Sequence, residues 1–123
     1  METIWMGISP SPVATRVVAM SGPGETILKA QMATDPKHPR ALGTLLEAVA
    51  LWQGLPVRAA LCVDSRVGSC ASNLYRDAFS EDGGALYSVV WVPPSAQRSR
   101  RVRLDGLGKF QDLERLVTRE VAR

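Results

Sequence analysis

The chain has 123 residues, which is enough for one domain of ordinary size and too few for two. Hydrophobic residues make up 46% of the sequence and charged residues 22%, a balance typical of a folded globular protein. The net charge of +3 is too small to indicate nucleic-acid binding by itself. No apolar run approaches the length of about 20 residues that crosses a bilayer, and the N-terminus has no signal-peptide pattern. We therefore expect a cytoplasmic protein that does not contact membranes.

The first third of the chain predicts three short antiparallel strands. Three apolar runs, Thr3 to Ser9, Thr15 to Met20 and Thr26 to Met32, are separated by turns rich in proline and glycine. This spacing is typical of a meander. The third run would form an edge of the sheet, and its apolar Ile27 and Leu28 leave pairing with a second copy of the chain open.

The rest of the chain alternates helices and strands. Apolar residues recur at helical spacing from Leu42 to Trp52, and Gly54 follows as a stop signal. The further expected elements are a strand at Val57–Val63, a short helix at Asn73–Phe79, a strand at Ala85–Val92 and a helix at Leu107–Val121. Helical crossovers permit parallel addition of the last two strands. The sequence therefore predicts one α/β domain, residues 1–123, built on a five-stranded mixed sheet.

A basic segment at residues 95–104 precedes the last expected helix. It contains four arginines: Arg98, Arg100, Arg101 and Arg103. Such a density of positive charge attracts phosphate groups. The alternative is a solvated linker with no ligand, and the sequence leaves both interpretations open.

The cysteines and the single histidine do not form a metal-binding pattern. Cys62 lies in an apolar run and is expected to pack as a small hydrophobic residue, whereas Cys70 lies in an expected loop. His38 has no second ligand at zinc spacing, so we expect no zinc site. A disulfide between Cys62 and Cys70 stays open.

The most specific motif lies at the end of the first expected strand. Gly7, Ile8 and Pro10 surround Ser9, and Thr15 follows a few residues later. Resolvases of the ribonuclease H-like fold begin their first strand with a Gly-Ile-Asp-Pro-Gly pattern followed by threonine. Together with the order of elements, this motif resembles the ribonuclease H-like superfamily, and Holliday-junction resolvase-type domains in particular. Ser9 stands where that family places its first metal-binding aspartate.

The exchange of aspartate for serine bears directly on the chemistry that the resemblance implies. Nucleases of this family use two divalent cations to bind the scissile phosphate and activate water. Mg²⁺ prefers oxygen ligands, usually carboxylates together with water and phosphate. The neutral Ser9 hydroxyl supplies neither the charge nor the second oxygen of an aspartate. The resemblance therefore predicts a degenerate active site without efficient nuclease activity and without a required cofactor.

Other acids only partly match the family pattern. The resemblance places Asp64, at the end of the fourth expected strand, beside Ser9, and it requires an acid from the last helix. Glu114 borders the apolar stripe of that helix, whereas Asp112, two residues earlier, points about 200° away. Glu47 corresponds only loosely to an acid of the first helix. The alternatives are that Asp64 caps a loop and that Glu114 and Glu47 are ordinary surface charges.

The leading interpretation is a catalytically degenerate ribonuclease H-like domain that binds nucleic acid or a protein partner. We expect its phosphate- or nucleic-acid-binding residues to be Ser9, Ser11, Thr15, Arg16, Arg98, Arg100, Arg101 and Arg103. Arg16 has two alternatives, neutralising Asp64 or facing outward from its strand. The Ser9 hydroxyl is expected to cap the turn that follows.

Three further interpretations remain. Asp64 and Glu114 would be the catalytic and metal-binding residues of a weak Mg²⁺- or Mn²⁺-dependent nuclease, with Glu47 or Asp105 as a further ligand. The hydroxyls of Ser9, Ser11 and Thr15 would serve a nucleotide-phosphate binder, which needs a dimer to complete the cleft. The last interpretation is a structural subunit that forms homo-oligomers.

Overall fold

The computed structural model describes residues 2–34, 41–62, 86–91 and 110–122. The elements in these ranges are β1 (Ile4–Pro10), β2 (Ala14–Gly22), β3 (Glu25–Ala33), α1 (Ala41–Gln53), β4 (Val57–Leu61), β5 (Tyr87–Trp91) and α4 (Phe110–Val121). The expected short helix at 73–79 and the basic segment at 95–104 lie outside the described residues. None of the described helices is long and apolar enough to cross a membrane.

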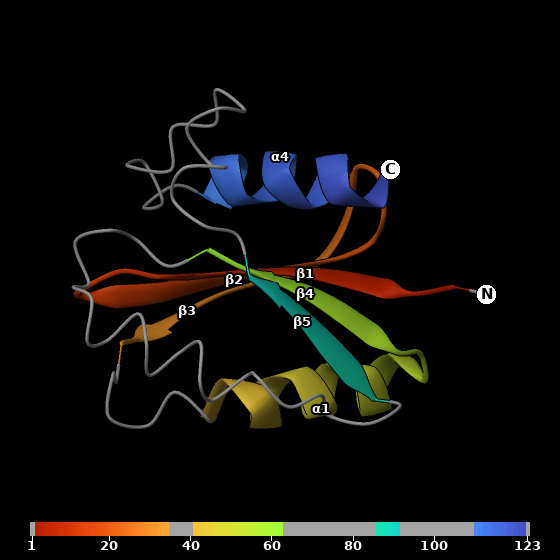
Figure 1. The fold of residues 1–123 in the computed structure, drawn as a ribbon, viewed down its shortest axis with the longest axis horizontal. Helices are drawn as coiled ribbons and strands as arrows, with labels where there is room; N and C mark the ends of the chain where they lie inside the picture. The colour runs from red at the N-terminus through yellow and green to blue at the C-terminus, as the bar shows by residue number, and fades with distance from the viewer. Residues whose placement is uncertain (1, 35–40, 63–85, 92–109, 123) are drawn as a thin grey trace.

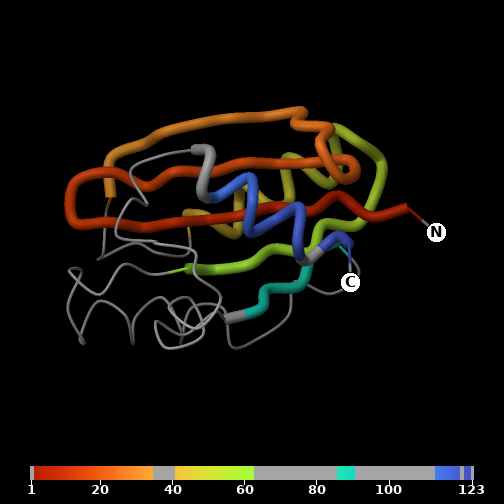
Figure 2. Tube along the Cα trace, turned by 90° about the horizontal axis from the view of Figure 1, so that it is seen from above, coloured from red at the N-terminus to blue at the C-terminus, as the bar shows by residue number. Residues whose placement is uncertain are grey.

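The five strands form one mixed sheet in the order β3-β2-β1-β4-β5. β1 pairs antiparallel with β2 and parallel with β4, and β4 pairs parallel with β5. Figure 2 shows β3 at one edge of the sheet and β5 at the other. The expected α/β fold with a five-stranded mixed sheet is thereby confirmed.

Glycine and serine determine the tight connections between the first three strands. Gly24 closes the β2–β3 hairpin with a φ of 79°, a conformation that residues with a side chain rarely adopt. Pro23 precedes it and restrains φ at the first position of the turn. In the β1–β2 turn, the Ser11 N–H donates to the Ala14 carbonyl at 3.0 Å.

Side chains from the two faces of the sheet enter two separate cores. Because side chains alternate along a strand, Met6 and Ile8 of β1 face α1, whereas Gly7 and Ser9 face α4. Figure 1 shows α1 and α4 on opposite faces of the sheet. β1 is therefore covered on both sides, as expected for the central strand of a two-sided sheet.

The inner face of α1 is formed by Leu42, Leu46 and Val49, which are buried against the sheet. Trp52 belongs to the same apolar series in the sequence, but 61% of it is exposed. Gly54 ends the helix with a φ of 67°, and the Leu55 N–H reaches back to the Ala50 carbonyl at 3.3 Å.

α4 contacts the sheet most closely at Gly7. A Cβ atom on Gly7 would lie 2.6 Å from Leu113 Cδ1 and 2.6 Å from Val117 Cγ2. Real Cβ atoms do not come this close to other carbons, so a glycine is needed for the helix to lie at this distance. The glycine of the opening motif thus has a packing role in this chain.

Candidate functional site

Ser9 lies at the carboxyl end of β1, where the family resemblance places the first acid. Its side chain is completely buried, and it is the one buried side-chain oxygen or nitrogen in the described ranges without a hydrogen-bond partner. Arg16 is its partner in the antiparallel register with β2, and both side chains face α4. On the other side, the Cys62 N–H donates to the Ile8 carbonyl at 2.8 Å, so the end of β4 lies beside the end of β1.

Ser11, rather than Ser9, closes the turn after β1. The Ser11 hydroxyl donates to the Ala14 carbonyl at 2.7 Å and accepts from the Ala14 N–H at 3.4 Å. The expectation that Ser9 caps this turn is therefore wrong. A proline separates the two serines, and the hydrogen bonds of the turn begin only after it.

Thr15 lies on the opposite face of the sheet from Ser9. It precedes Arg16, the register partner of Ser9, and side chains alternate along a strand. The Thr15 Oγ1 is 2.9 Å from Thr34 Oγ1, and the residue is buried. The structure therefore does not bring the hydroxyls of Ser9, Ser11 and Thr15 together as a phosphate cradle.

Glu114 projects from α4 toward the edge strand β3. Its Oε1 is 2.6 Å from Lys29 Nζ, and its Oε2 accepts a hydrogen bond of 2.9 Å from the Thr26 hydroxyl. The hydrogen bond from Lys29 lowers the pKa of the Glu114 carboxyl below its ordinary value of 4.5. The Thr26 hydroxyl and the charge of Lys29 act in the same direction, whereas partial burial opposes them.

The partners of Glu114 place its carboxylate away from the carboxyl end of β1. Lys29 of β3 pairs with Val18 of β2, and Val18 in turn pairs with Gly7 of β1. Ser9 lies two residues beyond Gly7 along β1. Two strand positions correspond to about 6.6 Å. The carboxylate also lies over β3, which is separated from β1 by β2. Glu114 is therefore not directed toward Ser9, as the last-helix acid of the resemblance would be.

Glu47 cannot share a metal ion with Glu114, because the two residues lie on helices on opposite faces of the sheet (Figure 1). The Glu47 side chain is exposed to solvent. Across the described ranges, no three His, Cys, Asp or Glu side chains gather in a group that could hold a metal ion. Asp64 and Asp105, the other predicted ligands, lie outside those ranges.

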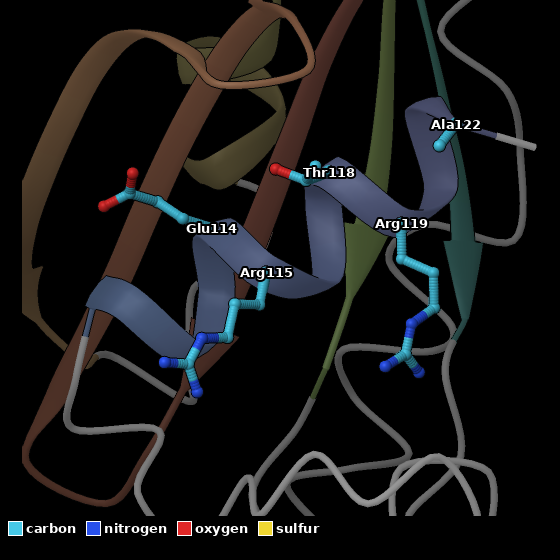
Figure 3. Close-up of a pocket in the computed structure, with 5 residues that line it drawn as sticks. All are labelled: Glu114, Arg115, Thr118, Arg119 and Ala122. Atoms are coloured by element: carbon cyan, nitrogen blue, oxygen red, sulfur yellow. The ribbon is translucent and has the colours of Figure 1, made fainter.

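The outer side of α4 carries two arginines that the sequence analysis did not select. Arg115 and Arg119 line a shallow pocket of about 440 Å³ together with Glu114, Thr118 and Ala122. Figure 3 shows both guanidinium groups on the same side of the helix, away from the Glu114 carboxylate. In the sequence, these two arginines could have been identified by their spacing of four residues, which places them one helical turn apart on the same side of the helix.

The predicted arginines of the basic segment, Arg98, Arg100, Arg101 and Arg103, lie outside the described residues, as does Cys70. Cys62 is buried and in the thiol form. A scan against protein-family models and a search of curated proteins found no match for this chain.

Proposed function

We propose that this chain is a ribonuclease H-like domain with a degenerate active site, and that it binds nucleic acid through phosphate contacts. The mixed sheet, with β4 parallel to β1 and a helix on each face, agrees with the resemblance of the opening motif. Two observations carry the proposal. The Glu114 carboxylate forms an ion pair with Lys29 of β3, and the residue at the end of β1 is Ser9, which is neutral and buried.

The geometry of Glu114 disfavours the nuclease alternative that depends on it. A divalent cation at this carboxylate would displace the Lys29 ammonium, which lies 2.6 Å away, or would share the carboxylate with it. Two like charges at such short range repel strongly. Ser9 adds no negative charge to offset this repulsion.

Arginines on two segments support binding of a polyanion. Arg115 and Arg119 lie on the outer side of α4, and the four arginines of residues 98–103 precede the same helix in the sequence. Contacts of arginine with phosphate supply affinity without reading the base sequence. We therefore expect binding that depends strongly on salt and weakly on sequence.

Fluorescence anisotropy with labelled single-stranded, duplex and branched DNA and with an RNA–DNA hybrid tests this proposal. Affinity should fall as salt rises from about 50 to 200 mM. The double variant Arg115→Gln/Arg119→Gln should reduce the salt slope by about one for each phosphate that these arginines neutralise. Arg58→Gln is the control for loss of one positive charge outside α4, because Arg58 lies on β4 over the Trp5 ring, 5.3 Å from its centroid. An equal effect per arginine removed in the control and in the double variant would contradict binding through α4.

The same substrates, incubated with Mg²⁺ or Mn²⁺, test the nuclease alternative. We expect no cleavage and no rise in melting temperature with either ion. Metal-dependent cleavage that Asp64→Asn abolishes would overturn the proposal of a degenerate site. Absence of both binding and cleavage would overturn the nucleic-acid function and favour a protein partner.

A further inference from the structure

The outer edge of β3 has no partner strand among the described residues, because β3 comes first in the order of the sheet (Figure 2). One contact just beyond the strand shows which backbone groups face this edge. The Thr34 N–H donates to the Val13 carbonyl at 3.2 Å, so these two residues form a hydrogen-bonded pair of the antiparallel ladder. Hydrogen-bonded and non-hydrogen-bonded pairs alternate along such a ladder. The backbone groups of Lys29, Gln31 and Ala33 therefore point away from β2, toward the free edge.

This edge is without three of the features that usually keep an edge strand from pairing, which are proline, a bulge and an unpaired lysine. β3 contains no proline, and its register with β2 is regular from Leu28 to Ala33. The one charge in this stretch belongs to Lys29, whose ammonium lies 2.6 Å from the Glu114 carboxylate. The ion pair neutralises the charge that would otherwise disfavour the approach of a second strand. Gln31 and Ala33 are both exposed, so this part of the edge is accessible.

We propose that β3 pairs antiparallel with β3 of a second copy of this chain, about a twofold axis at Gln31. In this register Gln31 lies opposite Gln31 of the second copy, and Lys29 lies opposite Ala33 of the second copy. All three residues whose backbone groups point outward then form hydrogen-bonded pairs, with about six hydrogen bonds across the interface. The two five-stranded sheets become one continuous sheet.

The other twofold registers satisfy fewer backbone groups or bring like charges together. An axis at Lys29 places the two ammonium groups directly opposite each other, which is destabilising. An axis at Ala30 leaves Ala33 opposite the irregular part of β3, and an axis at Met32 moves Lys29 beyond the end of the second strand. An axis at Gln31 separates the two copies of Lys29 by four strand positions, about 13 Å, which exceeds the screening length at physiological salt.

The side chains of β3 fit a second copy on both faces of the sheet. Ala30 packs against the core under α1, and Met32, two residues later on the same face, is 36% exposed. In the proposed register, Met32 of each copy lies opposite Ala30 of the other, so a large apolar side chain meets a small one. On the α4 face, the two Gln31 amides meet at the axis, where each can donate to and accept from the other.

A second copy is favoured over a flexible peptide because its strand is already formed. β3 is held extended by its pairing with β2, so two such edges pair without ordering further backbone. A flexible peptide would lose backbone freedom when it binds. Main-chain hydrogen bonds, rather than apolar area, supply the affinity in this kind of contact. The interface is narrow, and we expect dissociation constants between micromolar and millimolar.

Sedimentation velocity of the full chain over a range of concentrations tests the interface. Gln31→Pro removes an N–H that points to the free edge, so it spares the bonds between β2 and β3 and should weaken dimerisation at least about tenfold. Gln31→Lys should weaken it as well, because two like charges then meet at the axis. Gln53→Lys is the matched control, since it makes the same exchange on α1 and should leave the dimer unchanged. Circular dichroism checks that each variant is folded. A monomer up to about 1 mM, or a dimer that survives both Gln31 changes, would overturn the proposal.

Cysteine crosslinking tests the register. In a Cys70→Ser background, Gln31→Cys should form an intermolecular disulfide under mild oxidation, because the two Cα atoms of a hydrogen-bonded pair lie about 5.5 Å apart. Ala33→Cys should not, because its two copies lie about 13 Å apart. Crosslinking through residue 33, or through neither residue, would overturn the axis at Gln31.

The response to salt separates this interface from nucleic-acid binding. Backbone pairing with a neutralised Lys29 should change little between about 50 and 200 mM salt, whereas contacts with phosphate weaken strongly over that range. Dimerisation that falls as steeply as phosphate binding would contradict pairing through backbone groups. Each proposal can therefore fail without the other.

Discussion

Lys29 and Glu114 join the edge strand to the last helix through an ion pair of 2.6 Å. The same carboxylate accepts a hydrogen bond from Thr26, a residue 88 positions earlier in the chain. One side chain of α4 therefore contacts two residues of β3. These contacts explain why Glu114 is directed away from the end of β1.

The first prediction concerns the energy of this ion pair. Half of Lys29 and a quarter of Glu114 are exposed, so solvent screens the interaction. A double-mutant cycle with Lys29→Met and Glu114→Gln should give a coupling of about 0.2–1 kcal/mol. Urea denaturation measures the four free energies of unfolding. Glu47→Gln on the exposed face of α1 serves as control and should change stability by less than about 0.5 kcal/mol. A coupling of zero would show that the contact does not stabilise α4.

The second prediction concerns the pH dependence of stability. The pKa of Glu114 is lower in the folded chain than its ordinary value of 4.5, so its stabilising effect is complete above that value. The effect is lost as the pH falls through the lowered pKa. The difference in unfolding free energy between the wild-type chain and Glu114→Gln should therefore be largest at neutral pH and should shrink in acid. If the difference in unfolding free energy instead grew below pH 4.5, the pKa of Glu114 would have to be raised by folding, and the prediction would be wrong.

The third prediction compares two glycines in the sheet. Gly7→Ala forces a methyl group against the buried side chains of Leu113 and Val117 and should cost about 1–3 kcal/mol of stability. Gly22→Ala is the control, since the nearest atom to a Cβ there is 3.9 Å away. Adding Val117→Ala to Gly7→Ala should recover part of the loss caused by the clash. Chemical denaturation of the set checks this, and an equal effect at both glycines would contradict close packing at Gly7.

The fourth prediction assigns opposite roles to two nearby serines. Ser9→Ala removes a buried hydroxyl without a hydrogen-bond partner, so stability should stay the same or increase by up to about 3 kcal/mol. Ser11→Ala removes the bonds that close the turn and should cost about 0.5–1.5 kcal/mol. Thermal melts of the two variants, run in parallel, test the difference. A large loss from Ser9→Ala would mean that its hydroxyl is stabilising after all.

The sheet could be predicted from sequence because its signals are local. Runs of apolar residues between Pro- and Gly-containing turns fix β1, β2 and β3 to within two residues at each end. The helix over Ala41–Gln53 is equally clear from its spacing and from Gly54. The exposed position of Trp52 was not predictable in the same way. An all-round apolar helix offers several stripes, and only tertiary packing decides which one meets the sheet.

The candidate site was harder to predict because it depends on how the elements cross. The spacing of α4 places Glu114 beside the apolar stripe, but it does not say which strand that side of the helix meets. The crossing of α4 over the sheet brings Glu114 to Lys29. Likewise, the local sequence does not distinguish Ser9 from Ser11 as the residue that closes the turn. The residue type can be read from the sequence, whereas the direction of each side chain depends on the packing.

The position of α4 also has a consequence for biosynthesis. β1 and β2 are made well before α4, yet one face of these two strands is covered by this helix, which begins only at Phe110. The apolar side chains of Val18 and Met20, which lie on that face of β2, stay without this cover until α4 has left the ribosome. Until then this surface can bind chaperones or other nascent chains. A truncated transcript or a protease cut that removes α4 would leave the surface bare permanently, and such a fragment should aggregate.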